Sequence, residues 1–209
     1  MIPYRDDNPT RTFPFVTIGL IAMNVLVFLN LAFKPGYEEI VMRYGFLPGR
    51  WQPETFITSM FLHAGIEHLV FNMWYLWLFG DNLEDGLGHG RFLVFYLLGG
   101  LVALLLHSIM VSGAAEPVPC IGASGAISAV MGGYVTLFPR ANIHVLWIFF
   151  YSLRVFKLSA IYFLGFWFLE QLFVGGSSSA LGVATGVAYW AHIGGFAYGV
   201  VFAWIVKRL

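Results

Sequence analysis

The sequence has 209 residues, of which 59% are hydrophobic, 18% are aromatic and only 11% are charged, and its net charge is zero. Soluble domains carry about a quarter charged residues, so this composition, with a mean hydropathy of +0.77, excludes a soluble domain and indicates an integral membrane protein. The charges form no basic face, which argues against a nucleic-acid partner, and the single cysteine, Cys120, excludes an internal disulfide.

Six apolar segments are long enough, or nearly so, to cross a hydrocarbon core of about 30 Å at about 1.5 Å per residue. The first follows a short polar N-terminus, residues 1–11, and is too long for the core of a signal peptide, so we expect it to be retained. The predicted spans are residues 12–33, 64–81, 91–112, 122–139, 157–174 and 188–206. The sequence therefore predicts an all-α membrane protein with a single domain over residues 1–209.

The predicted connections differ in length and composition. Residues 34–63 form a long first loop rich in Tyr, Trp and Pro, a composition that suits the interface on the outer side. The second and third connections, DNLEDGLGHG and GAAEPVPC, are polar and turn-rich, whereas residues 175–187 are rich in Gly and Ser and are predicted to be mobile. The segment 141–156 is compatible either with an interfacial helix or with the start of a longer tilted span.

The distribution of Lys and Arg predicts the orientation of the chain. An even number of spans places both termini on one side of the membrane. That side then holds Arg5, Arg11, Arg91, Arg140, Arg154, Lys157, Lys207 and Arg208, and the other side holds Lys34, Arg43 and Arg50. Because cytoplasmic loops carry the excess of Lys and Arg, both termini are predicted to lie in the cytoplasm.

Four polar residues fall inside three of the predicted spans, near their outer ends. His68 and Asn72 are four residues apart on the second span and so share one helical face. Ser124 lies in GASGA at the start of the fourth span, and His192 lies about one turn into the sixth. Polar groups are costly in hydrocarbon and should face the bundle interior. Since all three spans run from outside to inside, these side chains are predicted to meet at one depth.

Small residues predict how closely the fourth and sixth spans approach. Gly195 and Gly199 share a face with His192, and their GxxxG spacing permits close contact between helix backbones. The fourth span offers further glycines, beginning with Gly125. Such a contact would bring the imidazole of His192 near the hydroxyl of Ser124.

Serine beside histidine indicates nucleophilic catalysis. A hydroxyl becomes a useful nucleophile when an adjacent base takes its proton, and histidine suits that role. The developing oxyanion needs donors, which His68, the amide of Asn72 and the backbone N–H of Ser124 could supply. This chemistry uses only side chains, backbone donors and water, so we expect no cofactor.

Other intramembrane chemistries fit the same residues less well. The metalloprotease motif HExxH is absent, and a metal site of His63, His68 and His192 stays open but leaves the serine unexplained. Aspartyl chemistry needs two carboxylates that share a site, whereas Asp81 and Glu170 are predicted to lie at opposite faces of the membrane. Glu170 is expected to form a hydrogen bond within the bundle or to reach the outer interface.

Taken in order, these motifs resemble those of the rhomboid intramembrane serine proteases. The GxSG motif falls on Gly122, Ala123, Ser124 and Gly125, the HxxxN motif on His68 to Asn72, and the AHxxGxxxG motif on Ala191, His192, Gly195 and Gly199. The likeness covers nearly the whole chain, from WQPETF to AHIGGFAYG. GxSG alone is a weak signal, whereas the three motifs at these span positions are a strong one.

The resemblance implies a six-span bundle of the minimal bacterial type, in a bacterial inner membrane, with Ser124 as nucleophile and His192 as general base. It implies an oxyanion hole that includes His68 and Asn72, with His63 in a supporting role. The implied substrates are transmembrane helices of other proteins, cut near the outer boundary, with the fifth span and the loop after it as gate and cap. Where some members have a tyrosine that stacks on the catalytic histidine, this chain has a serine, Ser128, which leaves the support of the histidine ring open.

Two other classes of function are compatible with a polytopic membrane protein. A catalytically inactive rhomboid-like protein would bind transmembrane helices without cutting them, but it would not need both Ser124 and His192. A channel or transporter would need polar residues along a path to the opposite side, whereas these cluster in one leaflet, and inverted repeats are not seen in the sequence.

Overall fold

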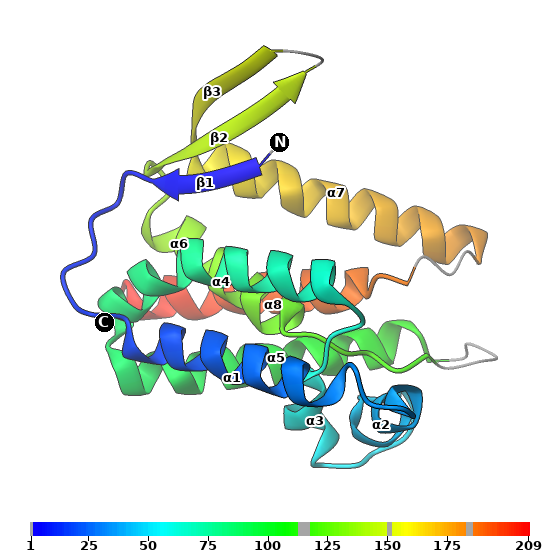
Figure 1. Ribbon diagram of the computed structural model, residues 1–209. Helices are drawn as coiled ribbons and strands as arrows, with labels where there is room; N and C mark the ends of the chain where they lie inside the picture. Colours follow the sequence, from blue (N-terminus) through cyan, green and yellow to red (C-terminus); the bar gives the residue numbers. More distant parts are fainter. Residues whose placement is uncertain (1, 113–117, 150–151, 183–185) are drawn as a thin grey trace.

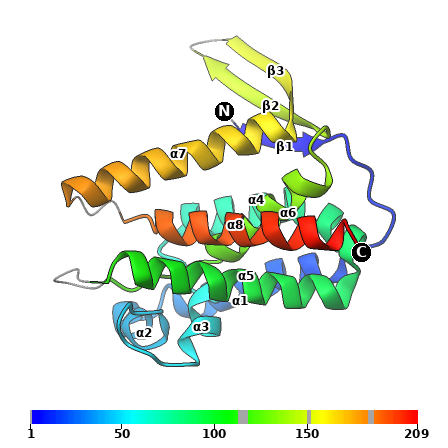
Figure 2. The ribbon, with the colours of Figure 1, turned by 180° about the vertical axis from the view of Figure 1, so that it is seen from behind.

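Six long helices form the body of the molecule and run side by side (Figures 1 and 2). The computed structural model describes residues 2–112, 118–149, 152–182 and 186–209. In chain order the long helices are α1 (Phe15–Leu31), α4 (Ile66–Leu87), α5 (His89–Met110), α6 (Ser124–Leu137), α7 (Ala160–Leu181) and α8 (Tyr189–Val206). Among the described residues, α5, α7 and α8 are long and apolar enough to cross a membrane, while α1 and α6 are apolar but shorter. The six helices overlap the six predicted spans, and crossing by all six stays a prediction.

The predicted first loop, residues 34–63, contains short helices. These are α2 (Tyr37–Tyr44), α3 (Thr55–Thr58) and the 3-10 helix η1 (Ser59–Phe61). A pair of backbone hydrogen bonds between Phe46 and Cys120 ties this region to the segment that precedes α6. The first loop is therefore a folded layer at one end of the bundle (Figure 1).

A three-stranded antiparallel sheet stands beside α7 and corrects two predictions (Figure 1). The strands are β1 (Ile2–Asp6), β2 (Asn142–Phe149) and β3 (Ser152–Ser159), in the order β1-β2-β3. Both interpretations of 141–156 as helix are therefore wrong, and the fold is mostly helical but not all-α. The hairpin finds its third strand in the N-terminal segment, where Ile2 pairs with Leu146 across more than half of the chain. Local sequence cannot reveal such a partner.

Helix α6 forms the centre of the bundle. It packs between α4, α5 and α8, and its residues from Gly125 to Val135 are all buried. Its contact with α8 is backbone against backbone: a Cβ atom added at Gly195 would lie 2.0 Å from the carbonyl oxygen of Gly125, and one at Gly199 would lie 2.0 Å from that of Ala129. The glycines of α8 thus occupy the close approach that their GxxxG spacing indicated.

Two helices continue beyond their predicted ends. Helix α7 extends to Leu181, so residues 175–181 of the predicted mobile loop are helical, and residues 183–185 of that loop lie outside the described residues. Helix α4 continues from the predicted end at 81 to Leu87 through the polar sequence DNLEDGL. The polarity of this sequence predicts a connection, but its acidic side chains accept hydrogen bonds from the chain around the start of α1.

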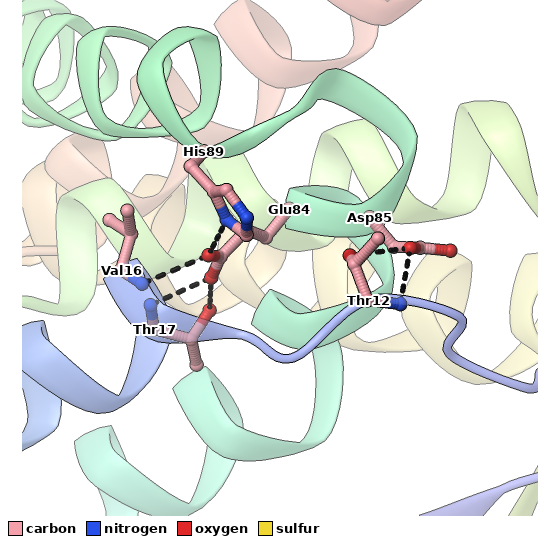
Figure 3. A network of polar contacts seen from close by, with 6 residues as sticks. All are labelled: Thr12, Val16, Thr17, Glu84, Asp85 and His89. Atoms are coloured by element: carbon pink, nitrogen blue, oxygen red, sulfur yellow. Dashed lines mark hydrogen bonds and ion pairs between the residues drawn. The ribbon is translucent and has the colours of Figure 1, made fainter.

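The carboxylate of Glu84 caps the N-terminus of α1 (Figure 3). Its two oxygens accept hydrogen bonds from the backbone N–H of Val16 at 2.9 Å and of Thr17 at 2.8 Å, and from the Thr17 hydroxyl at 2.7 Å. Nδ1 of His89 lies 2.6 Å from the same carboxylate, which is fully buried. The first N–H groups of a helix have no partner inside it and carry partial positive charge, so a carboxylate satisfies both needs.

Replacing Glu84 with alanine is expected to lower the free energy of unfolding by about 3 kcal/mol, because several buried donors lose their acceptor at once. Asp85, the next residue, is the matched control. It accepts hydrogen bonds from the backbone N–H and hydroxyl of Thr12 at the solvent-exposed rim, so Asp85→Ala should cost much less. Thermal unfolding in detergent measures both variants. An equal loss of stability in Glu84→Ala and Asp85→Ala would contradict the assigned role of Glu84.

Candidate active site

Ser124 is the first residue of α6. At this position its backbone N–H, like the two that follow, has no acceptor within the helix and is free to point toward a ligand. The turn before it depends on Gly122, which has φ +113°, a backbone conformation that favours glycine. A Cβ atom at Gly122 would also lie 2.7 Å from the ring of His68. The glycine of the GxSG motif therefore allows the histidine of the second motif to lie against the serine turn.

His192 lies on the first turns of α8 and faces Ser124. Its Nε2 atom is 2.9 Å from the Oγ atom of Ser124, a hydrogen-bond distance, and both residues are half-buried. The two side chains belong to helices whose backbones are in contact through Gly195 and Gly125. The helix packing therefore places the Ser124 hydroxyl and the His192 imidazole at a distance that would allow proton transfer between them.

The other ring nitrogen of His192 meets a residue that the sequence did not single out. Its Nδ1 atom is 2.8 Å from Oε1 of Gln171, a buried residue of α7. The sequence drew attention to the adjacent acid, Glu170, whose side chain is exposed. Only the periodicity of α7 could have distinguished them, because Gln171 shares a buried face with Phe163, Leu164 and Gly175; Glu170 lies outside it.

The ring of His192 is supported from α7. The Trp167 ring lies over it with a centroid separation of 5.9 Å and an interplanar angle of 35°. Ser128 does not perform this role, because its hydroxyl donates a hydrogen bond of 2.7 Å to the carbonyl oxygen of Ser124 within α6. The sequence leaves the support of the histidine ring open at Ser128, and in the structure a tryptophan on α7 lies against the ring instead.

His68 is oriented as a hydrogen-bond donor toward the serine turn. The backbone N–H of Ala64 donates to its Nδ1 atom at 3.3 Å, which places the ring proton of the neutral form on Nε2. That nitrogen lies next to Gly122. The ring of His63 packs against it with a centroid separation of 5.0 Å and is itself fully buried. Burial lowers the pKa of His63 to about 4, so this side chain is neutral at pH 7 and supports His68 by packing.

Asn72 lies one turn further along α4 and is buried. Its amide donates a hydrogen bond of 2.7 Å to the carbonyl oxygen of His68, which leaves one amide N–H for another acceptor. In the described part of the chain no hydrogen bond joins Asn72 to Ser124. The same part of the chain contains no group of three His, Cys, Asp or Glu side chains placed to hold a metal ion.

Asn72→Ala is expected to lower turnover by about 10²-fold or less, because the amide would be one of several oxyanion donors. The matched control is Asn24→Ala, a buried asparagine of α1 whose amide likewise donates to the carbonyl four residues back, that of Leu20. Steady-state cleavage rates at matched amounts of folded protein measure both variants. Unchanged turnover in Asn72→Ala would assign Asn72 to packing alone.

The fold and the site define a helical membrane protein that carries a serine and histidine pair at the start of its most buried helix. The chain belongs to the rhomboid family, since the family model described as the Rhomboid domain matches residues 50–209. All three motifs lie inside that match, which confirms the resemblance found in the sequence.

Named relatives agree with this assignment. Rhomboid protease GluP of Bacillus subtilis is 33% identical over 147 residues, which cover 66% of this chain and 27% of GluP. RHOMBOID-like protein 6, mitochondrial, of Arabidopsis thaliana is 32% identical over 72% of this chain and 42% of its own length. Rhomboid protein 1, mitochondrial, of Saccharomyces cerevisiae is 29% identical over 91% of this chain and 53% of its own length. The chain thus matches about a quarter to a half of the length of these relatives.

Proposed function

We propose that this chain is an intramembrane serine endopeptidase that hydrolyses peptide bonds in or near transmembrane segments of other proteins. The proposal rests on the distance of 2.9 Å between Ser124 Oγ and His192 Nε2, at the start of a helix whose first N–H groups have no acceptor within the helix. Membership in a family that includes a relative named as a protease supports it.

The proposed reaction has two halves. Ser124 Oγ attacks the carbonyl carbon of the scissile bond while His192 Nε2 takes its proton, and the oxyanion accepts hydrogen bonds from the Ser124 N–H, from His68 and from the amide of Asn72. The C–N bond then breaks, and the leaving amine takes the proton from His192. Water, deprotonated by His192, attacks the acyl-enzyme, releases the new carboxyl end and restores Ser124.

The proposed substrates are membrane helices that open easily near the outer boundary. A peptide bond in an intact helix is shielded and its carbonyl is already hydrogen-bonded, so the helix must unwind locally before Ser124 can attack. Helix α7 is the proposed gate: the side chains of Tyr162, Phe166, Leu169 and Phe173 on its outer face are more than 60% exposed and suited to contact with lipid or a substrate helix.

The excess of Lys and Arg on the side of the termini supports a cytoplasmic location for both, and we assign the chain to a bacterial cell membrane.

The test uses purified protein in liposomes with a single-span substrate that carries Gly and Pro near the outer end of its helix. The control substrate has Leu at those positions and forms a stable helix. We expect cleavage of the first and little of the second. Binding of the substrate without cleavage, measured by crosslinking, would instead support the inactive rhomboid-like alternative.

A further inference from the structure

We propose that Gln171 is a positioning residue that holds His192 in the tautomer able to accept the proton of Ser124, and that it does so only while α7 lies against α8. The inference rests on the proposed proteolytic function. The uncharged amide of Gln171 would then be a third member of the site, next to Ser124 and His192.

The position of the proton on the imidazole ring decides whether His192 can act as a base. A neutral histidine carries one N–H, and the hydrogen bond at one nitrogen decides the state of the other. With Oε1 of Gln171 at 2.8 Å, the proton lies on Nδ1, and Nε2 presents its lone pair to Ser124 Oγ at 2.9 Å. Without this acceptor, the proton is free to move to Nε2, where the ring can no longer act as the base.

The choice of an amide follows from burial. Gln171 is 6% exposed, and a carboxylate at such a site in a membrane protein would carry a large desolvation cost. A neutral amide fixes the tautomer without that cost, but it stabilises the imidazolium less than a carboxylate would. The acid of this region, Glu170, is turned away and exposed.

The dependence on α7 follows from how this helix is held. It lies at the edge of the bundle, on the opposite side of α8 from α1 and α5 (Figures 1 and 2). Its contact with α8 is made by aromatic and small residues: Phe168 stacks on Phe196 at 4.5 Å between centroids, and Trp190 Nε1 donates to Ser179 Oγ at 2.9 Å. Gln171 supplies the hydrogen bond from this helix to the ring of His192. Displacement of α7, by a substrate helix for example, would therefore remove the acceptor and disable the base until α7 returns.

The experiment measures the rate of inactivation of the full chain by a fluorophosphonate probe in detergent, between pH 5 and pH 9. Gln171→Met keeps the length of the side chain but removes the acceptor, and should lower the rate about 10- to 100-fold. Gln171→Glu should recover much of the rate and move the acidic limb of the pH profile up by about one unit or more, because a carboxylate favours the imidazolium. Glu170→Gln, the matched control on the exposed neighbour, should keep the parent rate and profile.

The readouts separate a positioning role from simple packing. A packing role would lower the rate in both Gln171 variants and leave the acidic limb where it is in the parent, and that result would overturn the inference. The inference would also be overturned if the Gln171→Met protein were inactivated by the probe at the rate of the parent. In either case a labelled parent would leave the proposed protease function standing, whereas no labelling of the parent would overturn both.

Discussion

Ser124→Ala is expected to lower cleavage of a membrane substrate by at least about 10⁴-fold, because it removes the oxygen proposed to attack the scissile carbonyl. His192→Ala should cause a comparable loss, and the double variant should be little worse than either single one, since the two residues act as a unit. Ser124→Ala removes one oxygen from a half-buried side chain, so this variant should stay folded and membrane-inserted.

Ser128→Ala is the matched control for this prediction. It removes a buried hydroxyl from the same helix, one turn further on, whose hydrogen bond to the Ser124 carbonyl stays within α6. We expect turnover within a few-fold of the parent. Substantial cleavage by a folded Ser124→Ala protein would contradict the assignment of the nucleophile.

The second large effect is expected from a single methyl group between α6 and α8. Gly199→Ala would place a Cβ atom 2.0 Å from the carbonyl oxygen of Ala129, which no rotation can relieve because both are backbone-fixed. The helices must separate, so we expect a loss of about 3 kcal/mol or more in unfolding free energy. Because α8 also carries His192, labelling of the serine should fall as well.

Gly165→Ala provides the comparison. This glycine lies on α7, where an added Cβ atom would meet nothing within 4 Å. The exchange should be neutral or slightly stabilising, since alanine is the better helix former. Thermal unfolding in detergent, followed by tryptophan fluorescence, measures both proteins. A Gly199→Ala protein as stable as the parent would mean that the backbones of α6 and α8 are not in contact.

The helices and the pairing of Ser124 with His192 were accessible from sequence because both depend on local patterns. Apolar runs of about 20 residues predict membrane-spanning helices. Polar residues at the same depth on spans that cross the membrane in the same direction are predicted to lie close together. The GxxxG spacing on α8 indicated that its backbone contacts α6. These signals need no knowledge of long-range pairing.

The remaining features depend on partners far along the chain. Strand β2 pairs with β1 across more than 130 residues, so the segment 141–156 gave no local sign of a sheet. Glu84 follows the predicted end of the second span and looks like part of a polar turn, until the start of α1 is placed beside it. Gln171 is next to Glu170, the charged residue that the sequence analysis singled out. Only the orientation of α7 shows that Gln171, and not Glu170, faces His192.

Ser124 is tested as the nucleophile most simply by fluorophosphonate labelling of the purified parent chain, with the modified residue identified by mass spectrometry. Ser124→Ala and His192→Ala proteins, each shown to be folded, are run beside it. We expect one modified residue, Ser124, and loss of labelling in both variants. Absence of labelling in a folded parent, or modification of another residue that persists in Ser124→Ala, would contradict it.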